Sequence, residues 1–185
     1  MREIERPPET GWLPDTPVED SVLRRFVMNH ADFNEIVAEA CGGRVTRTDD
    51  VSCADARSPV AFLNQAVLLR PLAGVDDPAL DVIEDAFDSP AVLLSVWPAP
   101  TLEGRGWNLM GHPMFVVRAP GPVPPHERPG VRVRDLHTIE DIGVFERVLV
   151  EGYPMPEGAG EPAGSFFPPA VLRASRRSPR SSPST

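Results

Sequence analysis

The sequence predicts a mixed α/β or α+β domain, and three observations lead to this prediction. Short apolar segments typical of strands occur among segments whose apolar residues recur at helical spacing. Glycine and proline residues separate these segments, as expected for turns and loops. Hydrophobic residues make up 41% of the 185-residue chain, which is enough for a packed core. The 23 prolines imply that loops and linkers take a large share of the length.

The first predicted element is a helix that begins at the capping box of residues 16–19, Thr-Pro-Val-Glu. We expect Gly42 and Gly43 to end this helix in a left-handed turn. It is either one long helix or a helix broken near Asn29. Its predicted buried face carries the apolar residues that recur at helical spacing, namely Val18, Val22, Phe26, Phe33, Ile36 and Val37.

Three strands and a second helix are predicted next. Residues 43–48 and 51–56 read as two short strands around a turn at Asp49 and Asp50, and residues 64–71 as a third. Asp76-Asp77-Pro78 predicts a helix start that satisfies the first backbone donors. This helix should end by Ser89-Pro90, and its predicted buried side consists of Leu80, Ile83, Ala86 and Phe87.

Two further strands complete the first domain. Residues 91–97 are nearly all apolar, which is typical of a central strand that is buried on both faces. Residues 114–118, Met-Phe-Val-Val-Arg, predict one more strand. The domain therefore covers residues 16–118 and follows a flexible segment at residues 1–15.

The rest of the chain divides into three parts. Residues 119–130 form a proline-rich linker, because their prolines remove backbone donors and fix the dihedral angles. Residues 131–156 carry a single strand and a helix from Thr138, whose apolar side is predicted to be Ile142, Phe145, Val148 and Leu149. Residues 157–185 are expected to be disordered, since the segment from Arg173 onward has no acidic and no large apolar residue.

Two stretches resemble a known family. Residues 130–156, GVRVRDLHTIEDIGVFERVLVEGYPMP, resemble the opening strand and helix of GNAT-type N-acetyltransferases. Residues 97–118, WPAPTLEGRGWNLMGHPMFVVR, resemble the N-terminal part of GNAT-type proteins that have an extra domain before the acetyltransferase unit. The resemblance implies a GNAT-like mixed sheet with flanking helices, followed by an incomplete second acetyltransferase domain. It also implies acetyl transfer from acetyl-CoA to the amine of a small molecule or peptide.

The family binds the pyrophosphate of acetyl-CoA with Arg or Gln followed by x-x-G-x-G or x-x-G-x-A, and the sequence does not contain this pattern. We therefore assign no catalytic and no cofactor-binding residue, and we expect the chain to bind no acetyl-CoA and to be inactive. Glu151 and Tyr153 are candidates for the substrate cleft, because some family members place a carboxylate base near this helix. The alternative is a non-catalytic module that binds a small molecule or a protein.

Charge and composition exclude several other functions. The net charge is −9, and the dense cationic cluster lies in the tail, at Arg173, Arg176, Arg177 and Arg180, so a nucleic-acid partner is not expected. A hydrophilic start and the absence of a 20-residue apolar run predict a cytoplasmic protein without a membrane partner. Cys41 and Cys53 lack metal-ligand spacing, so no metal site is assigned. The apolar side of the 138–152 helix predicts self-association.

Overall fold

The computed structural model describes residues 22–112, 130, 132, 136–152, 165, 166 and 170. The predicted capping box at residues 16–19, the strand at 114–118 and the strand residues Val131 and Val133 lie outside this part of the chain. The elements in chain order are α1 (Val22–Ala40), β1 (Arg44–Arg47), β2 (Val51–Asp55), the 3-10 helix η2 (Ala61–Leu63), β3 (Asn64–Leu68), α2 (Pro78–Ala86), β4 (Val92–Leu94), the 3-10 helix η3 (Glu103–Arg105) and α3 (Ile139–Gly152).

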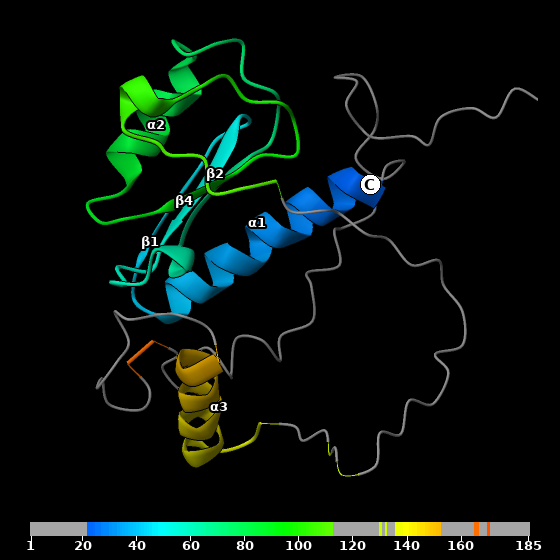
Figure 1. The fold of residues 1–185 in the computed structure, drawn as a ribbon, viewed down its shortest axis with the longest axis vertical. Coiled ribbons are helices and arrows are strands. Elements are labelled where there is room, and N and C mark those ends of the chain that lie inside the picture. The colour runs from blue at the N-terminus through cyan, green and yellow to red at the C-terminus, as the bar shows by residue number, and fades with distance from the viewer. Residues whose placement is uncertain are drawn as a thin grey trace, which may run out of the picture.

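The four strands form one mixed sheet in the order β1-β2-β3-β4. The first three strands are antiparallel, and β4 pairs with β3 in the parallel direction. A parallel pair needs a crossover connection, which α2 supplies. The predicted hairpin turn at Asp49 and Asp50 is confirmed, because the Thr48 amide donates to the Val51 carbonyl at 2.9 Å across it. The mixed α/β prediction is therefore confirmed at this level, with α1 and α2 on opposite faces of the sheet (Figure 1).

The larger part of the core lies between the sheet and α2. Side chains of β2 and β3 that point to this face pack against the buried residues of the helix, as the sequence predicted for Leu80, Ile83 and Ala86. Phe87 is half-buried at the edge of this cluster. The buried members of the cluster are Val51, Cys53, Ala66, Leu68, Leu80, Ile83, Ala86, Trp97 and Leu102.

The opposite face of the sheet packs against α1 through small side chains. Ala31 and Val27 contact Val67, and Ala38 contacts Ala54. This differs from the sequence prediction, in which the large apolar residues of α1 were buried. Val18 lies outside the described residues; among the described members of that set only Val37 is buried, while Val22, Phe26 and Phe33 are 55%, 37% and 52% exposed. Alanines allow a helix backbone to approach a sheet closely, so the alanine side of α1 faces the core.

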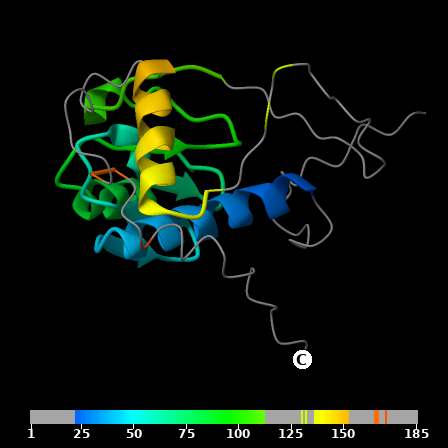
Figure 2. The same ribbon diagram turned by 90° about the horizontal axis from the view of Figure 1, so that it is seen from below.

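Helix α1 is continuous over its described residues, so of the two predicted alternatives the single long helix without a break near Asn29 is present. It ends where the two glycines predicted its end. Gly42 has a φ of +73°, and the Gly43 amide donates to the Ala38 carbonyl at 2.8 Å. This bond satisfies a carbonyl group that the helix end would otherwise leave without a partner. In the view from below, α1 runs alongside the strands (Figure 2).

Strand β4 differs from its prediction as a central strand buried on both faces. It covers only Val92–Leu94, its three residues are half-buried, and it is an edge strand among the strands that the structure describes. Among the described strands β4 pairs with β3 alone. Its apolar residues still pack on both faces of the sheet, because Leu93 joins the cluster under α2 and Leu94 the cluster under α1. A run of apolar residues thus predicted the strand but not its position.

Helix α3 begins directly after Thr138, the residue from which the sequence predicts it. The Asp141 amide donates to the Thr138 hydroxyl at 3.1 Å, and the Asp141 carboxylate accepts from the Thr138 amide at 3.1 Å. Ile142 and Glu146 are buried, and a Glu146 carboxylate oxygen accepts from the Phe166 amide at 3.2 Å. Phe166 is itself buried, although it belongs to the range for which the sequence predicts disorder.

Candidate functional site

The junction between β3 and α2 is the candidate ligand site of this fold. A turn that leads from a strand into a helix brings backbone donors and the positive end of the helix dipole together, and phosphate groups bind at such turns in α/β proteins. β3 ends at Leu68, Arg70 follows two residues later, and Asp77 is the N-cap of α2. An anionic cofactor at this junction would have to be held by these side chains.

The guanidinium of Arg70 is held between two carboxylates. Its Nη1 and Nη2 donate to Oδ2 and Oδ1 of Asp77 at 2.7 and 2.9 Å. Its Nε and Nη2 donate to Oδ1 and Oδ2 of Asp50 at 2.5 and 2.9 Å. These hydrogen bonds from Arg70 hold the pKa of Asp77 well below its ordinary value and also lower the pKa of Asp50.

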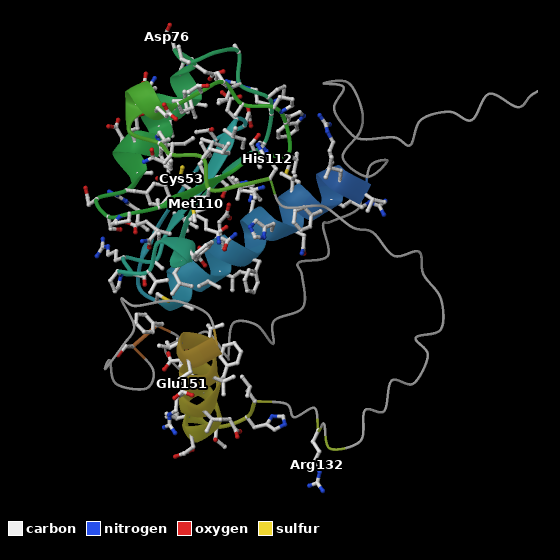
Figure 3. The ribbon with its side chains drawn as sticks, viewed as in Figure 1. Cys53, Asp76, Met110, His112, Arg132 and Glu151 are labelled. Atoms are coloured by element: carbon white, nitrogen blue, oxygen red, sulfur yellow. The ribbon has the colours of Figure 1, made fainter. Side chains whose placement is uncertain are left out.

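The first turn of α2 is also occupied by a side chain of the protein. Oδ1 of the buried Asp77 accepts from the Ala79 amide at 3.0 Å, and Oδ2 accepts from the Ala73 amide at 2.7 Å. The N-terminal partial charge of the helix is thus met by an internal carboxylate. Asp76, the neighbouring residue, is exposed at the outer end of the turn (Figure 3).

These residues do not fit the pyrophosphate of acetyl-CoA, the cofactor that the family resemblance implies. Arg70, Asp50 and Asp77 together carry one positive and two negative charges, so the junction repels a polyanion. The donors that would hold a phosphate, the guanidinium and the Ala79 amide, are already bonded to carboxylates. The arrangement is a structural clamp that fixes the β1–β2 hairpin turn and the start of α2 to the end of β3.

The residues predicted for a substrate cleft are only partly within the described chain. Glu151 lies on the last turn of α3 and is exposed (Figure 3). Tyr153 lies outside the described residues. The assignment of the two residues to a cleft therefore stays a prediction.

Two polar clusters between α1 and the sheet were not predicted. In the first, Glu35 accepts from the buried Ser52 hydroxyl and from Arg47, both at 2.7 Å. One carboxylate oxygen, Oε1 of Glu35, thus joins a side chain of β1 to a side chain of β2. In the second, the Gln65 carbonyl oxygen lies 2.9 Å from His30 Nε2 and 3.3 Å from Asn34 Nδ2. The partners are 12 to 35 residues apart, so no local motif indicates them.

Cysteines and histidines of the described residues form no reactive group that we can assign. Burial raises the pKa of the Cys53 thiol to about 12 and also raises the pKa of Cys41. His112 and His137 are exposed, and His126 lies outside the described part of the chain. No group of three or more His, Cys, Asp or Glu within that part could hold a metal ion.

Comparisons with known proteins found no matching family model, no matching curated protein and no matching solved structure. Among the described residues, no helix combines the length and the apolar character that crossing a membrane requires.

Proposed function

We propose that the chain is a member of the GNAT N-acetyltransferase family in which residues 22–112 form a non-catalytic accessory domain. The mixed four-stranded sheet with helices on both faces agrees with the layout that the resemblance implies. The sequence of residues 130–156 supports the family through its likeness to the opening strand and helix of an acetyltransferase unit.

The observation that carries the non-catalytic part of the proposal is the position of Arg70. An acetyl-CoA site needs cations and backbone donors that face the ligand, whereas Arg70 is bonded to Asp50 and Asp77 on both sides. The start of α2 is capped by the second of these carboxylates. The ion cluster thus already bonds the donors that a cofactor phosphate at the β3–α2 junction would need.

Calorimetry with acetyl-CoA tests the proposal on the full chain, together with a thiol-release assay on acetyl-CoA and a set of amines. We expect neither a saturable isotherm nor turnover. A double variant, Asp50→Ala with Asp77→Ser, leaves a capping residue at α2 but frees Arg70, and we expect it to bind acetyl-CoA more strongly than the parent chain. Asp76→Ala is the matched control, because Asp76 is exposed and should change nothing. Saturable binding or turnover by the parent chain would disprove the proposal.

A non-catalytic protein-binding module outside the family is the second candidate. It is favoured by the large apolar side chains that α1 presents to solvent. Both candidates predict no turnover. They differ in the role of residues 130–156, which the first candidate takes as the start of an acetyltransferase unit and which have no such role in the second.

A further inference from the structure

Helix α1 has a second apolar side that faces away from the sheet. Its residues are spaced by four, three, four and three positions along the chain. This is the spacing with which side chains line the contact seam of a coiled coil. Val22, Phe26, Asn29 and Phe33 are exposed and Ile36 is half-buried, and we call these five residues the α1 seam.

The α1 seam is presented by a helix that is already stabilised from its other side. Val27, Ala31 and Ala38 are buried against the sheet, so α1 does not depend on a partner in order to be helical. Binding of a partner to the seam therefore costs little conformational entropy of the helix backbone. Phe62 of η2, which lies against α1, is also exposed and extends the apolar surface.

The seam is self-complementary about Asn29. In an antiparallel pair with its two-fold axis at Asn29, Val22 lies opposite Ile36 of the second copy, since the two stand seven residues before and after Asn29. Phe26 and Phe33, three residues before and four after, lie within one residue of opposite positions. Asn29 then meets its own copy, and a carboxamide can both donate and accept a hydrogen bond there. A single asparagine in an apolar seam fixes the register of paired helices.

The charges beside the seam follow the same symmetry. Arg25 and Asp32 are both exposed, lie on the same flank of the seam, and stand four residues before and three residues after Asn29. In antiparallel helices like flanks meet, so Arg25 of each copy is brought near Asp32 of the other. Asp32 is bonded to Arg47 through Oδ1 at 2.6 Å, which leaves its Oδ2 for this contact.

We propose that the α1 seam is the interface of an antiparallel homodimer whose two-fold axis passes beside Asn29. The inference does not depend on the proposed function, because it uses only α1 and its exposed side chains. The seam from Val22 to Ile36 is about 21 Å long. A seam of this length buries less surface area than a standard protein interface. The dimer should therefore be weak, and its population should depend on concentration.

Sedimentation velocity of the full chain over a concentration series tests the interface. We expect a concentration-dependent dimer whose Kd rises at least about tenfold in Phe33→Ala, which removes apolar contact area, and in Asn29→Asp, which places two carboxylates at the axis. Both positions are exposed, so the circular dichroism spectrum should not change. A chain that stays monomeric at all concentrations, or a dimer that is unaffected by both substitutions, would overturn the inference.

Cysteine cross-linking tests the antiparallel register independently of the changes in Kd. In a Cys41→Ser background, an oxidant should cross-link Asn29→Cys, which lies on the axis, faster than Glu39→Cys, an exposed control on the same helix outside the seam. Val22→Cys should not cross-link to itself, because an antiparallel pair places it opposite Ile36. Efficient cross-linking at position 22 would show a parallel pair, and equal rates at positions 29 and 39 would show unspecific contact. Either result would contradict the proposal.

Discussion

Arg70 donates to both carboxylate oxygens of Asp77 at 2.7 and 2.9 Å, and Asp77 in turn caps helix α2. One carboxylate therefore connects the end of β3 to the start of the crossover helix. Its loss would remove a helix cap, and of the two carboxylates that Arg70 contacts it would leave that of Asp50.

Replacing Asp77 by alanine should lower the free energy of unfolding by about 2–4 kcal/mol, which combines the loss of an N-cap with the loss of a partly buried ion pair. Urea unfolding followed by circular dichroism measures the change. Asp76→Ala is the matched control, because Asp76 is exposed and adjacent, and it should stay within about 0.5 kcal/mol of the parent. Equal effects of the two substitutions would show that the cluster does not stabilise the fold.

The same cluster predicts how stability depends on pH. Hydrogen bonds from Arg70 lower the pKa of Asp77 in the folded chain. A carboxyl group with a lowered pKa stabilises the folded state above the unfolded value of about 4, and this contribution is lost as pH falls through the folded pKa. The free energy of unfolding should therefore decrease between pH 5 and pH 2.

Asp77→Asn separates this contribution from those of Asp50 and Glu84, whose pKa values are also lowered. Asparagine keeps a capping group at α2 but cannot titrate. The variant should be less stable than the parent at pH 7, and its stability should decrease less steeply toward pH 2. Urea unfolding at a series of pH values measures both slopes. Parallel slopes would show that Asp77 does not account for the acid sensitivity.

Alanine substitutions at three glycines should destabilise the fold to different degrees, according to the space and the φ angle at each position. A Cβ at Gly43 would lie 2.0 Å from the Asp55 carbonyl oxygen, so Gly43→Ala requires the end of α1 to move away from β2. We expect it to cost at least about 3 kcal/mol. Gly42→Ala meets open space but keeps a φ of +73°, so it should cost about 1 kcal/mol. Gly104→Ala meets neither problem and should change stability by less than about 0.5 kcal/mol.

Thermal unfolding of the three variants gives their order, which should be Gly43→Ala least stable and Gly104→Ala most stable. If Gly42→Ala were the least stable, the backbone conformation at the end of α1 would matter more than its close approach to β2.

Local signals in the sequence predicted much of this fold. Asp77 and Pro78 mark the start of α2, and Gly42 marks the end of α1, because caps and stops depend on residues that are adjacent in the chain. The buried side of α1 was predicted wrongly. The helix has two apolar sides, and the choice of the alanine side depends on the close fit of Ala38 to Ala54, which lies on a strand.

The ion cluster at the candidate site could not be predicted from the sequence, for a related reason. Arg70 is 20 residues from Asp50 and 7 residues from Asp77, so the three side chains meet only once the sheet has formed. The sequence showed that a phosphate-binding pattern is absent. It could not show that an ion cluster lies at the β3–α2 junction, because the contact depends on the pairing of β2 with β3.

Helix α3 supplies a test that contrasts two of its apolar residues. Phe145 and Val148 are 41% and 62% exposed, whereas Ile142 is 2% exposed. Exposed apolar surface favours association at about 25 cal/mol per Å² removed from water. Phe145→Glu should therefore raise the solubility of the chain and leave its unfolding transition unchanged. Ile142→Glu should destabilise α3 by several kcal/mol, roughly the cost of burying an unpaired charge.

Solubility in an ammonium sulfate series and hydrogen exchange of the α3 amides measure the two effects. The α1 seam variant Phe33→Ala shows for comparison how much solubility changes when exposed apolar area is removed from the proposed α1 interface rather than from α3. If Phe145→Glu exposed the amides of α3 to exchange as Ile142→Glu does, Phe145 would contribute to a buried contact in solution. The helix would then be covered on both sides, and the expectation of self-association through α3 would be wrong.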